Sequence, residues 1–503
     1  MKKDIALIII SSILYSFLFY QEGAGVNFLI FTVLLITFQV VNNPKIIGLN
    51  TWLLAAVAGI CSGIGIVLYG SALSITANII SLFTLSFTAY SIKTSFPVGL
   101  FHATYSVGSS VVFVVLDGFL PPYKQKNDKR KYRWSFTQFV FYFIIPSLAI
   151  LVFFFLYRSG NIAFEQATED IDLSFISPPW LLFLIGGSFL MYGFFRHHVI
   201  RPFQRLDENA GNTLIEKSAP TKLDQLLDQH VEKRSGVVLL ILLNLLILFM
   251  NATDVVFLLG GAILPDGVNL SDSVHNGVGS LITSIVFAVL IILFYFRGRL
   301  NFIEKNKTLK ALAVVWIVQN LLLVASTAHR NYEYIAAHGL TYKRIGVYVY
   351  LVLTVIGLLY TLVKLTQFKT NWYLVRKVSW CFFIVLTISP IVNWDRLVYN
   401  SQLNLSNDKE VSLDVDYLSK LSSECYPMLY EYAQHHGDQD LLHKLERKVG
   451  QYLVKRANRD WRSYTVRNGK LDRFIENRLP KTKQKKLVEE IIEESFMFQS
   501  MRY

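Results

Sequence analysis

Ionisable and amide side chains interrupt two of the most apolar stretches of this chain. Asn244, Asn251 and Asp254 lie in the first stretch, and Asn320 and Arg330 lie in the second. On a helix each residue advances by about 100°, so spacings of 7 and 10 residues place the first three side chains within about 80° of one another. The second stretch repeats the 10-residue spacing. Each stretch therefore predicts a helix with one polar stripe.

Asp254 and Arg330 are expected to reach nearly the same depth of a membrane. Both stretches are predicted to run from inside to outside, with Asp254 18 residues after Gly236 and Arg330 19 residues after Ala311. A charge inside a bilayer is costly unless it is paired or hydrated, so we expect these two side chains to form an ion pair. Amide side chains also form hydrogen bonds between membrane helices. The stripe is interpreted either as a set of bonds that joins two helices or as the lining of an outward-facing polar cavity.

The loop after the first stretch adds polar groups that favour the second interpretation. It reads "LPDGVNLSDSVHNG", in which Asp266 lies in a turn signal and His275 is predicted in the first turn of the next helix. A histidine at that position could respond to pH. The cavity interpretation predicts these substrate-binding residues: Asn251, Asp254, Asp266, His275, Asn320 and Arg330. The sequence predicts no catalytic residue, cofactor or metal site, and its three cysteines have neither metal nor redox spacing.

The composition sets the class of the protein. Of 503 residues, 53% are hydrophobic and 17% are charged, against about a quarter charged in soluble proteins. Apolar runs of the length that crosses a bilayer recur along the chain. They predict eleven spans, at 4–20, 26–42, 50–70, 73–94, 136–157, 178–195, 236–256, 277–296, 311–328, 345–363 and 377–393. The expected fold is all-α, a polytopic transmembrane helical bundle.

Loop charge predicts the topology. The loops 121–134, 196–234, 297–310 and 364–377 hold 22 Lys and Arg residues, whereas the opposing loops 158–176, 257–276 and 329–344 hold 4. Positive loops face the cytoplasm, so the N-terminus is predicted inside and the C-terminus outside. This bias requires that segment 97–118 does not cross, and we expect an in-plane or bent helix on the cytoplasmic side.

The predicted organisation has four parts. N-terminal spans (1–95) precede an interfacial helix and a basic loop (96–134), the main bundle (135–394) and a soluble helical tail (395–503). The net charge of +13 is attributed to cytoplasmic loops and not to nucleic-acid binding. The basic loop 121–134 is interpreted either as an ordinary topology signal or as a site for anionic lipid. The bilayer itself is the expected partner, and the sequence predicts no oligomeric state.

Three segments together resemble a known family. They are "NATDVVFLLGGAILPDGVNLSDSVHNG", "WIVQNLLLVASTAHRNYEYIAAHGLTYKR" and, in the tail, "DVDYLSKL" followed by "DWRSYTV". The resemblance is to a bacterial family of multi-pass membrane proteins that is catalogued only as a domain of unknown function. It covers roughly 235–465 and implies a protein of the bacterial cytoplasmic membrane. It supplies no catalytic residues.

Three functional hypotheses follow from the sequence. The first is transport or sensing of a small solute or ion through the outward-facing polar pocket. The second is a non-catalytic scaffold or signalling partner that acts through its tail and its cytoplasmic loops. The third, an enzyme of lipid or envelope precursors, ranks last because no nucleophile, metal or phosphate-binding motif is present in the sequence.

Overall fold

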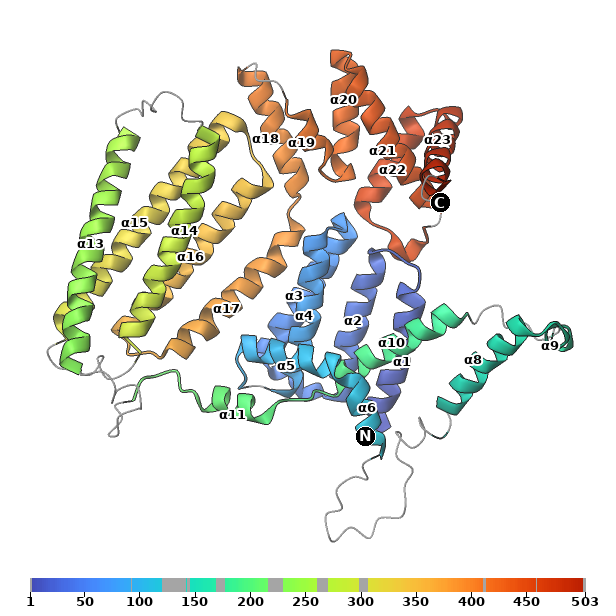
Figure 1. Ribbon diagram of the computed structural model, residues 1–503, viewed down its shortest axis with the longest axis horizontal. Helices are drawn as coiled ribbons and strands as arrows, with labels where there is room; N and C mark the ends of the chain where they lie inside the picture. The colour runs from blue at the N-terminus through green and yellow to red at the C-terminus, as the bar shows by residue number, and fades with distance from the viewer. Residues whose placement is uncertain are drawn as a thin grey trace, which may run out of the picture. The chain divides into compact units, whose positions relative to one another are not determined.

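A computed structural model shows an all-helical protein (Figure 1). It describes residues 2–91, 93–119, 142, 145–168, 177–215, 229–259, 270–297, 306–409, 413–457 and 459–500. Among these residues the regular elements are all helices, apart from one isolated bridge between Thr213 and Lys369. The all-α class predicted from the sequence is confirmed.

The chain forms two units. Unit 1 consists of Met1–Asp207, Thr387–Val392 and Glu446–Tyr503, and unit 2 consists of Glu208–Leu386 and Asn393–Leu445. The segment 395–503, predicted as one soluble tail, thus contributes residues to both units. The boundary in the tail falls inside helix α21 (Gln439–Ala457).

Unit 1 is built on long apolar helices near the N-terminus. They are α1 (Lys2–Phe19), α2 (Val26–Asn42), α3 (Asn50–Tyr69), α4 (Ala72–Tyr90) and α10 (Pro178–Phe195), with a 3-10 turn at Pro44–Gly48. Small side chains on α3, among them Ala55 and Ala58, are buried, and α3 packs closely on α4. Small residues allow close helix approach, as is usual where helices associate in lipid.

A polar cluster lies inside this packing. The side-chain amide nitrogen of Asn78 on α4 donates to the Gly59 carbonyl at 3.0 Å and to Ser62 Oγ at 3.2 Å, and Asn78 Oδ1 accepts from Thr32 Oγ1 at 3.3 Å. All three side chains are fully buried. The amide therefore joins α2, α3 and α4.

Segment 97–118 is not one continuous helix. It forms α5 (Phe96–Gly108) and α6 (Ser110–Phe119), which are separated at Ser109, and α5 runs crosswise to α3 and α4 in Figure 1. Neither helix is among those long and apolar enough to cross a membrane. This is consistent with the expected bent helix. Two further helices, α8 (Ile145–Gly160) and α9 (Ile162–Ala167), follow, and the basic loop 121–134 lies outside the described residues.

The chain that leaves α10 is held by side chains of α4 and α5. Ser86 Oγ donates to the Phe194 carbonyl at 2.8 Å, and Tyr90 donates to the Phe195 carbonyl. Ser106 Oγ lies 2.9 Å from the carbonyl oxygens of both Gly193 and Arg196, which share its one hydrogen. These bonds satisfy carbonyls at the end of α10 that have no partner within the helix.

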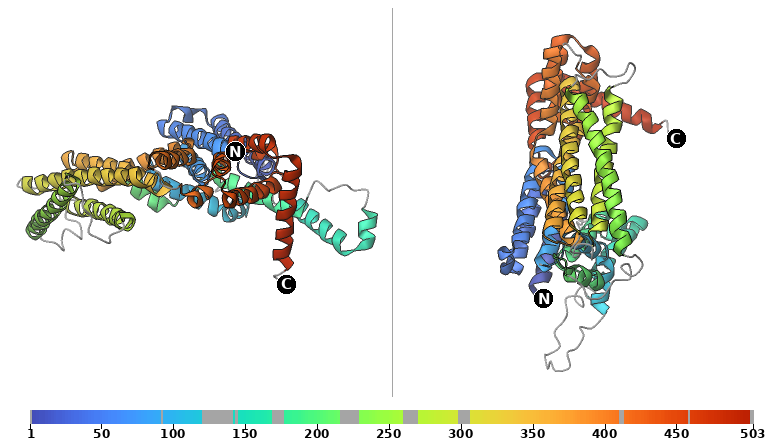
Figure 2. Two further views of the ribbon diagram at one scale, coloured as in Figure 1. Left: turned by 90° about the horizontal axis from the view of Figure 1, so that it is seen from above. Right: turned by 90° about the vertical axis from the view of Figure 1, so that its left-hand side faces the viewer.

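Unit 2 contains the second group of membrane helices. They are α13 (Gln229–Leu259), α14 (Leu270–Tyr295), α15 (Lys307–His338), α16 (Tyr342–Thr366) and α17 (Asn371–Ile388), and the short helix α11 (Arg201–Asn209) spans the unit boundary. α15 is the central helix, because α13, α14 and α16 all pack against it. α13 and α14 lie on the same side of α15 and α16 (Figure 2).

Seven of the described helices are long and apolar enough to cross a membrane. They are Asn50–Tyr69, Ala72–Tyr90, Pro178–Phe195, His230–Val256, Lys307–His338, Tyr342–Thr366 and Asn371–Ile391. Four shorter apolar helices, Asp4–Phe19, Val26–Asn42, Ala149–Gly160 and Gly279–Tyr295, lie at the other predicted spans. The protein is an integral membrane protein, and the total of eleven spans stays a prediction.

The regular elements of the tail are all helices among its described residues. It comprises α18 (Trp394–Lys409), α19 (Val415–Ser419), α20 (Tyr426–His436), α21, α22 (Val466–Arg478) and α23 (Lys481–Ser500), with 3-10 turns at Ser423–Cys425 and Trp461–Ser463. Its first part belongs to unit 2, where Tyr342 Oη at the start of α16 donates to Asp395 Oδ1 at 2.7 Å. Ser422 also donates to Asp395.

The second part of the tail contacts the turn between α1 and α2 in unit 1. Arg462 pairs with Glu22 at 2.7 Å, and Ser463 also donates to Glu22. The backbone N–H of Val26 donates to the Tyr464 carbonyl at 3.1 Å. Gly25 is required for this approach, because a Cβ atom there would lie 2.4 Å from the carbonyl carbon of Ser463.

Candidate functional site: a polar stripe between α13 and α15

The polar residues of α13 face α15 in a regular register. Asn244 is bonded to Gln319, and its amide donates to the Leu312 carbonyl at 3.1 Å. Asn251 donates to the Gln319 carbonyl at 3.2 Å. The bonded partners are 68 or 75 residues apart in the sequence. A later residue of α13 contacts a later residue of α15: Asn244 bonds to Leu312, and Asn251 bonds to Gln319. The two helices therefore run in the same direction and pack along their lengths.

An ion pair closes the stripe at the far end of α13. Arg330 donates to Asp254 Oδ1, and Ser326 Oγ donates to Asp254 Oδ2 at 2.6 Å. The side chain of Asp254 is 3% exposed and that of Arg330 is 25% exposed. The predicted pairing of Asp254 with Arg330 is confirmed. The carboxylate is buried and has a partner on each oxygen, whereas the guanidinium extends toward the surface.

Asn320 does not take part in this register. Its amide donates to the carbonyl of Trp316, one turn earlier on its own helix, at 2.7 Å. Asn320 instead lines a cavity of about 530 Å³ that includes Met250 of α13 and Phe287 of α14. Asn320 thus lies beside α13 and α14 without a hydrogen bond of the stripe, and its role in binding a substrate stays a prediction.

The residues that form the α15 side of the stripe are Gln319, Ser326 and Arg330. Their spacings of 7 and 11 residues place them within about 40° of one another, closer than Asn320 and Arg330. The spacing of Gln319, Ser326 and Arg330 is visible in the sequence. However, Gln319 and Asn320 are neighbours, and only the packing against α13 determines which of the two faces that helix. Gln319 is buried, with 8% of its surface exposed.

Two of the predicted site residues cannot be placed beside the stripe. Asp266 lies outside the described residues, and His275 belongs to α14 but its side chain is not described. The structure thus brings together Asn251, Asp254 and Arg330. Their role in binding a substrate stays a prediction.

A second set of contacts orders the C-terminal end of α15 and its connection to α16. The Asn331 amide donates to the Arg344 carbonyl at 3.2 Å, and the Arg344 guanidinium lies 4.0 Å from the centre of the Tyr334 ring. Arg344 also donates to the carbonyl of Gly339. These contacts hold the α15–α16 turn beside the ion pair's end of α15.

One thiol lies in the part of the tail that belongs to unit 2. Cys425 of the tail is fully buried, and burial together with the nearby carboxylates of Asp395 and Glu424 raises its thiol pKa to about 12. A thiol with such a pKa is unreactive at neutral pH. Among the described residues, no group of three His, Cys, Asp or Glu side chains could hold a metal ion.

Comparison with protein families identifies the chain. The model of a family described as a domain of unknown function, DUF4153, matches residues 6–432. The chain belongs to the DUF4153 family. The match extends well before the segment 235–465 that carried the sequence resemblance, and it covers most of unit 1's membrane helices as well as the stripe. It ends before the "DWRSYTV" segment of the tail.

The family assignment confirms the resemblance to a domain of unknown function. No match was found among the curated proteins or among the solved structures. DUF4153 membership therefore assigns no substrate, and the function has to be argued from the stripe.

Proposed function

We propose that this DUF4153 protein transports or senses a small polar solute or ion, which binds at the outer end of the α13–α15 stripe. The observation that carries the proposal is the buried carboxylate of Asp254 and its partner Arg330. Two helices can be joined by apolar packing at least as stably as by a buried ion pair. Ionisable groups at membrane depth more often serve a solute or ion.

The two members of the pair differ in exposure, since the Asp254 side chain is buried and the Arg330 side chain is partly exposed, as a binding site requires. The carboxylate is fixed by Ser326 as well as Arg330, so it stays in place when the guanidinium moves. Arg330 is partly exposed and sits one turn before Tyr334, near the end of α15. An anionic solute would compete with Asp254 for Arg330, and a cation would compete with Arg330 for Asp254. Opening the pair would then release one of the contacts between α13 and α15 at this end of the stripe.

The test is a comparison of charge-removing variants in cells that lack the native gene. Asp254→Asn and Arg330→Gln are expected to abolish complementation although the protein is still inserted. The matched control is Glu333→Gln, which removes a carboxylate from the same end of α15. The Glu333 side chain is 62% exposed and pairs with His329 in an i,i+4 contact of 3.8 Å. Full complementation by both stripe variants would refute the proposal.

The proposed location is the cytoplasmic membrane of a bacterium, with the N-terminus inside and the tail outside. Positive-inside loop charge supports this orientation. The contact of Arg462 with Glu22 supports it independently, because Glu22 follows the end of α1 that is opposite the N-terminus. If α1 crosses the bilayer, residue 2 and this part of the tail lie on opposite sides. Reporter fusions or labelling at both ends would test the assignment.

The second candidate function is a scaffold or signalling partner that acts through its tail. The observation that favours it is the double attachment of the tail, through Asp395 in unit 2 and through Arg462 in unit 1. A scaffold should tolerate Asp254→Asn and fail when an exposed tail residue such as Trp461, which is 54% exposed, is replaced by Ala. The two candidate functions thus predict opposite sets of tolerated variants.

A further inference from the structure

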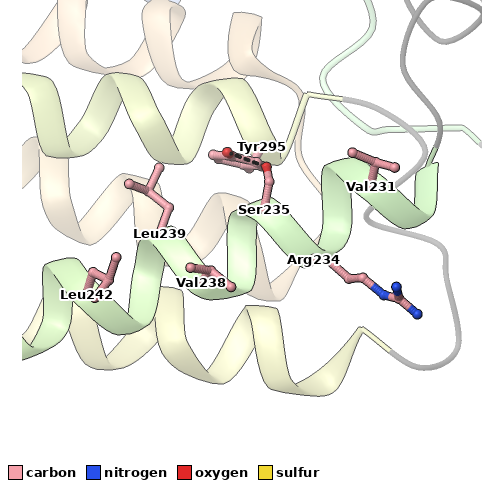
Figure 3. A pocket seen from close by; sticks show the side chains of 7 residues that line it. All are labelled: Val231, Arg234, Ser235, Val238, Leu239, Leu242 and Tyr295. Carbon is pink, nitrogen blue, oxygen red and sulfur yellow. Dashed lines mark hydrogen bonds between the residues drawn. The ribbon is translucent and has the colours of Figure 1, made fainter.

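A groove lies on the surface of unit 2 at the first turns of α13 (Figure 3). Its volume is about 540 Å³, within the range of roughly 300–1,000 Å³ that is typical of sites for small molecules. The aliphatic side chains of Val231, Val238 and Leu242 line it, together with Ser235 and Tyr295. Arg234 lines the same groove.

The groove is aliphatic along one face of α13 and polar at one end. Val231, Ser235, Val238 and Leu242 follow spacings of 4, 3 and 4 residues and therefore share one face of the helix. Val238 is 57% exposed and Leu242 is 59% exposed, so this face is not covered by another described helix. Arg234 lies about 60° from the centre of the face, near its N-terminal end.

The polar end is built by a close approach between α13 and α14. The hydroxyls of Ser235 and Tyr295 are 3.1 Å apart and hydrogen-bonded. Gly236 allows the aromatic ring to lie against α13, because a Cβ atom there would be 2.9 Å from two atoms of the Tyr295 ring. The neighbouring guanidinium, Arg297, is paired with Glu232 at 2.7 Å. Arg234 has no carboxylate partner among the residues that the structure describes.

The position of the groove limits what can occupy it. The candidate span that contains it begins at His230, so Arg234 lies at the edge of the membrane and Leu242 lies about 12 Å further into it. At that depth the surrounding medium is hydrocarbon. The occupant must therefore place an anionic group beside Arg234 and an alkyl chain along Val238 and Leu242.

We infer that this groove binds one anionic phospholipid, whose phosphate pairs with Arg234 and whose acyl chain lies along Val238 and Leu242. Arginine forms strong, charge-assisted hydrogen bonds with phosphate. Basic pockets at the ends of membrane helices are a recurring form of lipid recognition. The site is separate from the Asp254–Arg330 pair, which is 20 residues and about 30 Å further along α13. It does not depend on the proposed solute function.

The first test measures lipid binding to the full-length protein in neutral detergent by native mass spectrometry. Phosphatidylglycerol should bind in preference to phosphatidylcholine, with one tight site per chain. Arg234→Gln should weaken the binding of phosphatidylglycerol about fivefold to tenfold, because the charge-assisted contact of one cation with the phosphate is lost. The matched control is Lys307→Gln, which removes an exposed cation from the start of α15 outside the groove. It should leave the affinity unchanged.

The second test separates the acyl chain from the head group. Val238→Trp fills the groove with an apolar side chain while Arg234 is retained, and it should also weaken phosphatidylglycerol binding. Glycerol 3-phosphate, which has the phosphate but no chain, should not compete at the lipid's concentration. Equal binding of phosphatidylglycerol and phosphatidylcholine, or an unchanged affinity for phosphatidylglycerol in Arg234→Gln, would overturn the inference. A protein dimer that excludes lipid would also overturn it, because the groove would then be filled by a second copy of the chain.

Discussion

Replacement of Gly25 by Ala tests whether the tail is attached to the α1–α2 turn. The added Cβ would lie 2.4 Å from the carbonyl carbon of Ser463, 2.6 Å from the carbonyl oxygen of Tyr464 and 2.8 Å from Ser463 Cα. All three are backbone atoms, so no side-chain rotation relieves the overlap. The tail segment must move away from the turn.

The cost can be worked out from the contacts that this movement breaks. Overpacking a close contact costs about 1–3 kcal/mol. The hydrogen bonds from the Val26 N–H to Tyr464 and from the Gly23 N–H to Ser463 Oγ contribute about 0.5–1.5 kcal/mol each. The tail attachment should therefore lose roughly 3 kcal/mol, which increases the fraction of molecules with a detached tail about a hundredfold.

Limited proteolysis of the purified, detergent-solubilised protein measures this detachment. Cleavage in the segment 459–465 should accelerate strongly in Gly25→Ala. The matched control is Gly186→Ala in the middle of α10, where an added Cβ meets no atom within 4 Å. It should be neutral or slightly stabilising, because Ala favours a helix over Gly. If Gly25→Ala cleaves no faster than this control, the attachment of the tail to the α1–α2 turn is wrong.

Two further predictions concern unit 1. Asn78→Leu removes the amide that joins α2, α3 and α4. At about 0.6 kcal/mol for each of three hydrogen bonds between membrane helices, it should lower the free energy of unfolding by about 2 kcal/mol, measured by thermal unfolding. The control Ile79→Leu changes a side chain that is 42% exposed and should be near neutral. The pKa of His197 is lowered to about 4, chiefly by burial and further by His102 and His198, so the unfolded chain takes up a proton that the folded chain excludes. Stability should therefore fall by about 2–3 kcal/mol as the pH drops from about 6.5 to 4. His197→Phe, which keeps the ring stacked on Tyr90, should flatten this part of the pH profile, and an unchanged slope would show that other groups cause it.

The membrane helices and their polar face could be predicted because they depend on local pattern. Long apolar runs form helices in lipid, where every backbone group must be bonded within the chain. The stripe on α13 followed from helical spacing, and the pairing of Asp254 with Arg330 followed from the cost of an isolated charge. Both inferences used only one or two helices at a time.

The contacts between distant segments could not be predicted in this way. Gln319 and Asn320 are adjacent and similar in chemistry, and the choice between them depends on how α15 is rotated against α13. The attachment of Arg462 to Glu22 joins residues that are 440 positions apart. The sequence around each of these residues contains no pattern that predicts contact with the other. The division of the tail between two units could not be predicted either, because it also depends on contacts between segments that are distant in the sequence.

A comparison of single variants with a charge exchange at Asp254 and Arg330 tests the central proposal most directly. The single variants Asp254→Asn and Arg330→Gln and the exchanged pair are compared by thermal unfolding in detergent and by complementation in cells. The solute-site account predicts that complementation is lost in all three, including the exchanged pair, because the solute requires each charge in its native place. Loss of about 3–5 kcal/mol of stability in each single variant, with both stability and complementation restored by the exchange, would contradict the account and leave the pair as a bond between helices.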